Sequence, residues 1–225
     1  MYAFFDVDGT LLDLRSMTRF QDFYLRREGP GPRALGAARS GLFFTRFACW
    51  QLLGKDRNFL NRAYYRSYRG RSPDVIRARA EEWFAFEKQR RNDLLIAPAV
   101  RALEAHRARG DVPVFVSGSL TELLEPLARE LGVMHCLATR LQVRDGRYTG
   151  EIEGPQMIGE GKATAIRAFL TEHGADASAC FAYGDHSSDV PMLEAVGHPV
   201  AVAGDRRLAE HARQRGWAIL LPRAA

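Results

Sequence analysis

The sequence predicts an α/β protein whose parallel sheet is interrupted near its start by a helical insertion. From residue 96 onward, apolar runs of strand length alternate with amphipathic stretches, which is typical of a parallel sheet with helices on both faces. Between residues 15 and 95, Arg, Phe, Tyr and Leu instead recur at three- and four-residue spacing, and no stretch alternates convincingly. We therefore expect a core domain of residues 1–14 and 96–225 and an inserted helical cap domain of residues 15–95.

The first strand is expected to end in two acids, in the sequence FFDVDGTLLD of residues 4–13. On a strand, positions i and i+2 face the same side, so Asp6 and Asp8 should project together where the strand gives way to a loop. Neighbouring carboxylates repel, and a folded chain tolerates them when a cation neutralises one or a proton is held by the other. The alternative is structural, with Asp6 capping a turn and Asp8 belonging to an ordinary Asp-Gly turn.

The insertion should contain four helices. Apolar spacing predicts them near residues 16–27, 33–53, 56–69 and 73–91. Glycine and proline break the pattern at three places, which are Gly29-Pro30-Gly31-Pro32, Gly54 and Ser72-Pro73.

Two groups of side chains in the insertion share a helical face by their spacing. The groups are Arg62, Tyr65, Arg66 and Arg69, and Arg46 with Trp50. Such a face could close over an anionic or sugar-like substrate and exclude bulk water. More often it is a solvated stripe beside packed aromatic residues, so both interpretations stay open here.

Strands and helices then alternate to the end of the sequence. Strands are expected at residues 112–117, 180–184, 199–202 and 217–221, and helices at 121–131, 189–196 and 205–215. Residues 140–154, RLQVRDGRYTGEIEG, are typical of a hairpin, because Asp145-Gly146 is a strong two-residue turn signal.

Polar side chains follow several of these strands, at the edge where open parallel sheets bind ligands. Ser117 follows the apolar run of residues 112–116, and Asp185 and Asp189 follow the run of residues 180–184. Lys162 opens a helix after a glycine-containing turn. Together with the two acids near the start, these residues form a candidate site.

Composition is typical of a soluble globular protein, with 225 residues, 46% hydrophobic and 26% charged. The longest apolar candidate, residues 42–53, contains Arg46 and is too short for a bilayer helix, so we expect no membrane association. A secretory signal is not expected, because the first strand begins next to Met1, and a cytoplasmic location follows. The thiols of Cys49, Cys136 and Cys180 lack metal-ligand spacing, and we expect them to be reduced and mostly buried.

Basic residues are in excess, with a formal charge of +5 and a pI of about 9.4. The arginines are dispersed and no aromatic-basic recognition motif is present, so we expect no nucleic-acid partner. Only three of the 32 basic residues are lysines, namely Lys55, Lys88 and Lys162. In such a chain a lysine is a candidate for a site that needs a compact point charge. For Lys55 and Lys88, chance is the better explanation.

The motifs around Asp6, Ser117, Lys162 and Asp185, in this order and spacing, resemble those of the haloacid dehalogenase (HAD) superfamily of phosphohydrolases. The resemblance is to subfamily IB, which contains the phosphoserine phosphatases and carries a helical cap after the first motif. It implies a Rossmann-like parallel-sheet core with a C1-type cap. Each of these residues also has a structural explanation. Ser117 and Asp189 could cap helices, and Lys162 could be a surface cation. These explanations require that all three residues match the order and spacing of the family motifs by coincidence.

By this resemblance, Asp6 is a nucleophile that attacks phosphorus, and Asp8 protonates the leaving oxygen and then activates water. Mg²⁺ would bind the side chains of Asp6 and Asp185 and the backbone carbonyl of Asp8, with Asp189 as a ligand or as a group that orients water. Lys162 would hold the nucleophile and a phosphoryl oxygen. The implied phosphate-binding residues are Gly9, Thr10, Ser117 and Gly118.

The residue expected to recognise the alcohol part of the substrate departs from the family pattern. Phosphoserine phosphatases carry a Glu nine residues after the nucleophile, where this chain has Arg15. Arginine repels an ammonium group and suits carboxylate, phosphate or hydroxyl-rich groups, so phosphoserine is expected to be a poor substrate. The sequence therefore predicts a magnesium-dependent phosphatase acting on a small phosphate monoester through an aspartyl-phosphate. The alternatives are a phosphomutase of the same superfamily and a catalytically silent phosphometabolite-binding protein.

Overall fold

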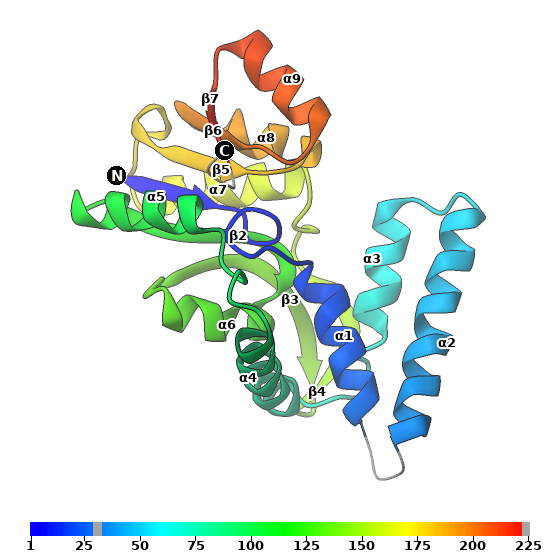
Figure 1. The fold of residues 1–225 in the computed structure, drawn as a ribbon. Coiled ribbons are helices and arrows are strands. Elements are labelled where there is room, and N and C mark those ends of the chain that lie inside the picture. The colour runs from blue at the N-terminus through cyan, green and yellow to red at the C-terminus, as the bar shows by residue number, and fades with distance from the viewer. Residues whose placement is uncertain (29–32, 222–225) are drawn as a thin grey trace.

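A computed structural model describes residues 1–28 and 33–221, in which a seven-stranded sheet is flanked by helices (Figure 1). The strands are β1 (Tyr2–Phe5), β2 (Val112–Leu120), β3 (His135–Arg144), β4 (Arg147–Glu153), β5 (Phe181–Gly184), β6 (His198–Val202) and β7 (Ala218–Leu220). Their spatial order is β4-β3-β2-β1-β5-β6-β7. All neighbouring pairs are parallel except β3 with β4, as the alternating pattern after residue 96 predicts.

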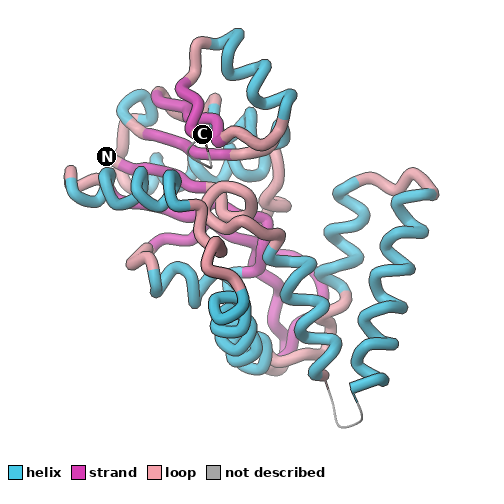
Figure 2. The backbone as a smooth tube through the Cα atoms, in the orientation of Figure 1, coloured by secondary structure: helices cyan, strands magenta, loops and turns pink. Residues whose placement is uncertain are grey.

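The helices of the described chain cover both faces of this sheet or, in part of the insertion, stand beside it (Figure 2). They are α1 (Ser16–Arg27), α2 (Arg33–Leu52), α3 (Arg57–Arg66), α4 (Pro73–Arg90), α5 (Ala97–Ala108), α6 (Thr121–Glu130), α7 (Glu160–Glu172), α8 (Val190–Leu193) and α9 (Arg206–Arg215), with 3₁₀ turns η1 (Ala177–Ala179) and η2 (Ser187–Asp189). In the described part of the chain, none of them combines the length and the apolar character that crossing a membrane demands.

Strand β1 lies in the middle of the sheet because both of its faces are apolar. Successive side chains of a strand point to opposite faces, and accordingly Phe4 packs in one core cluster while Ala3 and Phe5 pack in the other. The first cluster includes α7 and α9, and the second includes α5 and α6. Because β1 is the central strand in the spatial order, its carboxyl end lies at the middle of the edge where the parallel strands end.

The expected hairpin is present. Asp145 and Gly146 both have positive φ, 51° and 71°, between antiparallel strands β3 and β4. A two-residue turn of this kind matches the right-handed twist of the strands, which is why Asp-Gly predicts it.

The inserted helices α1 to α4 lie close to the boundaries that the sequence predicts, and the break predicted at residues 29–32 lies outside the described residues. In Figure 1, α2 and α3 form a hairpin that stands beside the sheet, next to α1. This hairpin faces the edge at which the parallel strands end.

Three expectations differ from the structure. Helix α5 was missed, because alanines and charged residues leave few large apolar positions in its pattern. The helix predicted over residues 189–196 is a 3₁₀ turn followed by the four-residue α8. Cys180 is buried and Cys136 half-buried, but the expectation of a buried thiol is wrong for Cys49, which is exposed on α2.

Candidate active site

Asp6 continues β1 by one residue, and its backbone N–H donates to the carbonyl of Tyr183 on β5 at 2.9 Å. Its carboxylate Oδ1 accepts from Nζ of Lys162 at 2.6 Å, and the same ammonium bonds Oδ1 of Asp189 at 2.7 Å. Lys162 stands on the first turn of α7 and is only 5% exposed. Burial alone would lower the pKa of this lysine, but Asp189 and Asp6 raise it above the ordinary value.

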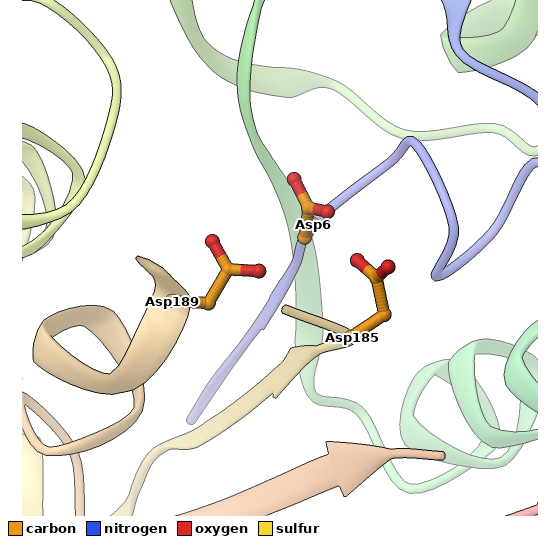
Figure 3. A group of neighbouring side chains, drawn as sticks. All are labelled: Asp6, Asp185 and Asp189. Atoms are coloured by element: carbon orange, nitrogen blue, oxygen red, sulfur yellow. The ribbon is translucent and has the colours of Figure 1, made fainter. Parts of the chain in front are cut away.

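Three carboxylates converge at this point (Figure 3). Asp6, Asp185 and Asp189 each offer an oxygen, and these atoms lie within 4.8 Å of one another. Burial raises the pKa of Asp6 well above its ordinary range although Lys162 opposes the shift, and burial followed by the charge of Asp189 raises the pKa of Asp185. One lysine therefore does not neutralise the cluster.

The turn after Asp6 wraps around Asp185. Gly9 has φ of +87°, and a Cβ there would lie 2.2 Å from Oδ2 of Asp185. Only glycine fits both the backbone conformation and this close approach. The hydroxyl of Thr10 donates to Oδ1 of Asp185 at 3.3 Å, so the structure directs this predicted phosphate-binding group toward the acid cluster.

Asp8 is held by one of its two carboxylate oxygens. The backbone N–H and the hydroxyl of Ser16 both donate to Oδ2 at 2.9 Å, where the N-terminus of α1 meets the acid. Oδ1 is buried and has no hydrogen-bond partner in the described chain. Burial, then the charge of Asp6, raises the pKa of Asp8 to about 7, although the bonds from Ser16 oppose this shift. The carboxyl can therefore gain and lose a proton near neutral pH.

The end of β2 supplies a short polar segment beside the acids. The Ser117 hydroxyl is buried and accepts from the N–H of Ser119 at 3.1 Å. The hydroxyls of Ser16 and Ser119 share a hydrogen bond at 2.9 Å, in which Ser16 accepts because its own proton goes to Asp8. The carbonyl of Gly118 accepts from the hydroxyl of Tyr65 at 2.8 Å, which joins α3 to this segment.

These groups line one cleft of about 670 Å³ between the sheet edge and the inserted helices. The sheet wall contains the predicted residues Asp6, Asp8, Ser117, Gly118, Lys162, Asp185 and Asp189. Residues of the helical wall come from α1, α2, α3 and the segments beside them, and include Arg15, Phe47, Gln51, Lys55, Leu60 and Tyr64. The cleft thus unites residues separated by more than 150 positions in sequence.

The predicted arginine-rich face of α3 points elsewhere. Arg62 and Tyr65 line a separate pocket of about 370 Å³ against β4, and Arg66 pairs with Glu151 at 3.1 Å. Arg46 stacks on Trp50 at 4.4 Å and does not appear among the described residues of the cleft wall. Helix α3 therefore presents its other side, with Leu60 and Tyr64, to the cleft.

Sequence reasoning also passed over residues that the fold brings to the site. Ser119 and His186 are not among the predicted site residues, but both line the cleft. The N–H of His186 donates to Asp189 at 3.3 Å. Ser16 was not singled out, and the available signal was its position at the start of a predicted helix that follows an acid-containing turn.

Comparison with known proteins shows a family relationship. The family model for haloacid dehalogenase-like hydrolases matches residues 3–194. A probable phosphatase of Mycobacterium tuberculosis is 46% identical over 127 residues, which cover 56% of this chain and 44% of that protein. The chain thus spans less than half the length of this relative. A phosphoserine phosphatase of M. tuberculosis is 34% identical over 227 residues, or 96% of this chain and 69% of that protein.

A solved structure extends the similarity to the whole chain. A protein of unknown function from Bordetella pertussis Tohama I has a TM-score of 0.82 and 31% sequence identity, and the alignment covers 97% of both chains. The inserted helices and the sheet therefore occur together in another protein.

Proposed function

The chain belongs to the haloacid dehalogenase-like hydrolase family, and on that premise we propose that it is a magnesium-dependent phosphatase of small phosphate monoesters. The observation that carries the proposal is the pairing of two acids in one cleft. Lys162 bonds the carboxylate of Asp6, whereas Asp8 is bonded through Oδ2 and its Oδ1 has no partner among the described residues. The first acid suits a nucleophile and the second suits a proton carrier.

In the first step, a carboxylate oxygen of Asp6 attacks phosphorus. The new O–P bond forms as the bond to the leaving alkoxide breaks, and Asp8 transfers its proton to that oxygen. Lys162 favours the ionised form of the nucleophile and would supply positive charge to the phosphoryl oxygens. The products are the alcohol and an aspartyl-phosphate on Asp6.

In the second step, Asp8, now ionised, takes a proton from water as the water oxygen attacks phosphorus. The Asp6–phosphate bond breaks, inorganic phosphate leaves, and Asp8 is protonated again. A pKa of Asp8 near 7 suits a group that must act as acid and then as base. Ser117 and Gly118 line the same cleft, and their hydroxyl and backbone N–H groups would bind the phosphate.

The residues at the acid cluster fit a magnesium ion. Three carboxylates within 4.8 Å supply hard oxygen donors. Burial, together with the neighbouring acids, raises the pKa values of Asp6 and Asp185 although Lys162 opposes both shifts, so a further cation would be stabilising here. Asp6, Asp185 and Asp189 would hold the ion. When bound, it would lower the repulsion between the carboxylates and the phosphate.

The test is phosphate release from p-nitrophenyl phosphate and a panel of phosphorylated metabolites, measured after EDTA treatment and again after addition of Mg²⁺. A radiolabelled ester, mixed with excess enzyme and quenched in acid, should leave label on the wild-type chain and none on Asp6→Asn. Release of phosphate in EDTA at the full rate would contradict the metal assignment. Transfer of label to a second hydroxyl without phosphate release would indicate a phosphomutase.

We further propose that residues 1–14 and 96–225 form the core domain and residues 15–95 the cap domain. The position of the inserted helices on one side of the cleft supports this division. The relatives named as phosphatases support phosphate esters as the substrate class, and the cytoplasmic location stays a prediction.

A further inference from the structure

We propose that the leaving group of the substrate carries a second negative charge, and that Arg15 and Lys55 bind this group on the helical wall of the cleft. The inference rests on the proposed phosphatase function, because it concerns the part of the substrate that lies beyond the phosphate. It adds to that function a chemical class, namely phosphate esters with an anionic tail.

Charge is separated between the two walls of the cleft. The sheet wall contains the acidic cluster together with Lys162. Among the described lining residues from the helical wall, the charged ones are Arg15 and Lys55, and both are cations. A tail that extends from the phosphate toward this wall meets positive charge and no carboxylate.

The two cations are also available. Several basic residues of the inserted helices have acidic partners, as in the pairs Arg19–Glu87 at 3.0 Å and Arg71–Glu28 at 3.1 Å. Neither Arg15 nor Lys55 makes an ion pair with any residue that the structure describes. An unpaired cation that lines a cleft can exchange water for an anionic ligand without first breaking a salt bridge.

The backbone on both sides of Lys55 is fixed by capping. Gly54 has φ of +72° and ends α2 in a Schellman motif, in which its N–H donates to Gln51 and the N–H of Lys55 donates to Trp50, both at 3.0 Å. The next residue, Asp56, caps α3 by accepting from the N–H of Phe59 at 2.7 Å. The turn therefore holds Lys55 at the cleft.

Arg15 is tied to the reaction site by its neighbour. It directly precedes Ser16, whose N–H and hydroxyl bind the carboxylate of Asp8. Arg15 is therefore adjacent in sequence to the residue that holds Asp8, the proposed proton carrier. Its planar fork can bind a carboxylate or a second phosphate through two parallel hydrogen bonds.

The experiment compares four three-carbon phosphates that differ only at the far end. Propyl phosphate ends in a methyl group, 3-phosphooxypropionate in a carboxylate, propane-1,3-diol bisphosphate in a phosphate and 3-aminopropyl phosphate in an ammonium. We expect kcat/KM for the carboxylate or the bisphosphate to exceed that for propyl phosphate by at least about tenfold, with the amine lowest. The carboxylate and bisphosphate arms identify which anion the site prefers.

The variants Arg15→Gln and Lys55→Gln should each lower the ratio of kcat/KM between the preferred anionic ester and propyl phosphate by about five- to fiftyfold. The matched control is Arg46→Gln, which removes a cation from the same helical hairpin outside the described cleft wall and should leave the ratio unchanged. A wild-type ratio near one, or equal ratios in wild type and both variants, would overturn the inference. No hydrolysis of any ester, p-nitrophenyl phosphate included, would instead contradict the proposed function.

Discussion

The two walls of the cleft differ in how their side chains are held. On the sheet wall, Asp6 and Lys162 are at most 6% exposed, and each is bonded to a residue far away in sequence. On the helical wall, Arg15 and Lys55 are exposed and make no ion pair with a described residue. The first wall is organised before any ligand arrives, as the proposed phosphoryl transfer requires, and the second presents cations to the part of the substrate that we propose to be anionic.

The walls are joined at two places. Ser16, at the start of α1, binds Asp8 and Ser119, and Tyr65 of α3 binds the carbonyl of Gly118. The inserted helices are therefore attached to the segments that surround the proposed phosphate site. The following predictions test whether chemistry is confined to the sheet wall and how strongly the walls are joined.

The largest effect is expected for Asp6→Asn. The isosteric amide cannot form the anhydride with phosphate, so turnover should fall by at least about 1,000-fold while the circular dichroism spectrum and the unfolding midpoint stay close to those of the wild type. Asp145→Asn is the matched control, because asparagine also accepts the positive φ of the β3–β4 turn. Near-normal phosphate release by a sequence-verified Asp6→Asn protein would rule out the covalent mechanism.

Asp8→Asn should separate the two chemical steps. With an alkyl phosphate, the first turnover should slow by about 100- to 10,000-fold, because the alkoxide needs a proton. With p-nitrophenyl phosphate, the first equivalent of nitrophenolate should appear with a much smaller loss, since this leaving group needs no acid, and later turnovers should stall. Stopped-flow measurement of both esters tests this, and an equal loss in the first turnover would show that Asp8 is not the acid.

Lys162→Met should destabilise the sheet wall. The substitution leaves Asp6 and Asp189 buried without their cation, which should lower the free energy of unfolding by about 3–5 kcal/mol in EDTA. Urea denaturation with and without Mg²⁺ measures the effect, and the ion should recover more stability in the variant than in the wild type. Lys88→Met removes the partly exposed pair with Glu130 and a contact with the Phe84 ring, and should cost less than about 1 kcal/mol. Equal losses in the two variants would contradict the assigned role of Lys162.

The stability of the metal-free protein should fall as pH rises. The pKa of Asp8 is raised from 3.8 to about 7, so the folded protein holds a proton that the unfolded chain has released. The resulting stabilisation is complete below pH 3.8 and is lost as pH passes through about 7. Between pH 6 and pH 8 this group alone should remove about 1.4 kcal/mol from the free energy of unfolding in EDTA.

Magnesium should reduce that pH dependence, because the ion binds the ionised carboxylates and therefore stabilises the fold most at pH 8. Urea denaturation at three pH values, with EDTA or Mg²⁺, provides the measurement. An increase in the free energy of unfolding from pH 6 to pH 8 in EDTA would contradict a raised pKa for Asp8.

The smallest effect is expected for Tyr65→Phe, which removes a bond between the walls. The carbonyl of Gly118 keeps a second donor, the hydroxyl of Thr139 at 3.0 Å, so the loss should be about 0.5–1.5 kcal/mol in the free energy of unfolding. Tyr2→Phe is a comparison outside the cleft. A change in kcat without a change in stability would show that this bond also positions the phosphate site.

The sequence by itself determined the sheet wall. Its residues stand at the ends of apolar strands, and the ends of parallel strands meet at one edge, so Asp6, Asp8, Ser117 and Asp185 could be predicted as neighbours from local pattern alone. The helical insertion and the Asp-Gly hairpin were also predictable, because periodicity and turn chemistry are local properties.

Tertiary structure decided the helical wall and the partners of the acids. Periodicity shows which residues of α3 share a face, but only packing against β4 decides that Arg62 and Arg66 turn away while Leu60 and Tyr64 face the cleft. In the same way, the sequence around Lys55 gives no sign that the turn after α2 lies at the same cleft as the acids. These facts depend on contacts between segments far apart in the chain, and such contacts leave no periodic signal in the sequence around either partner.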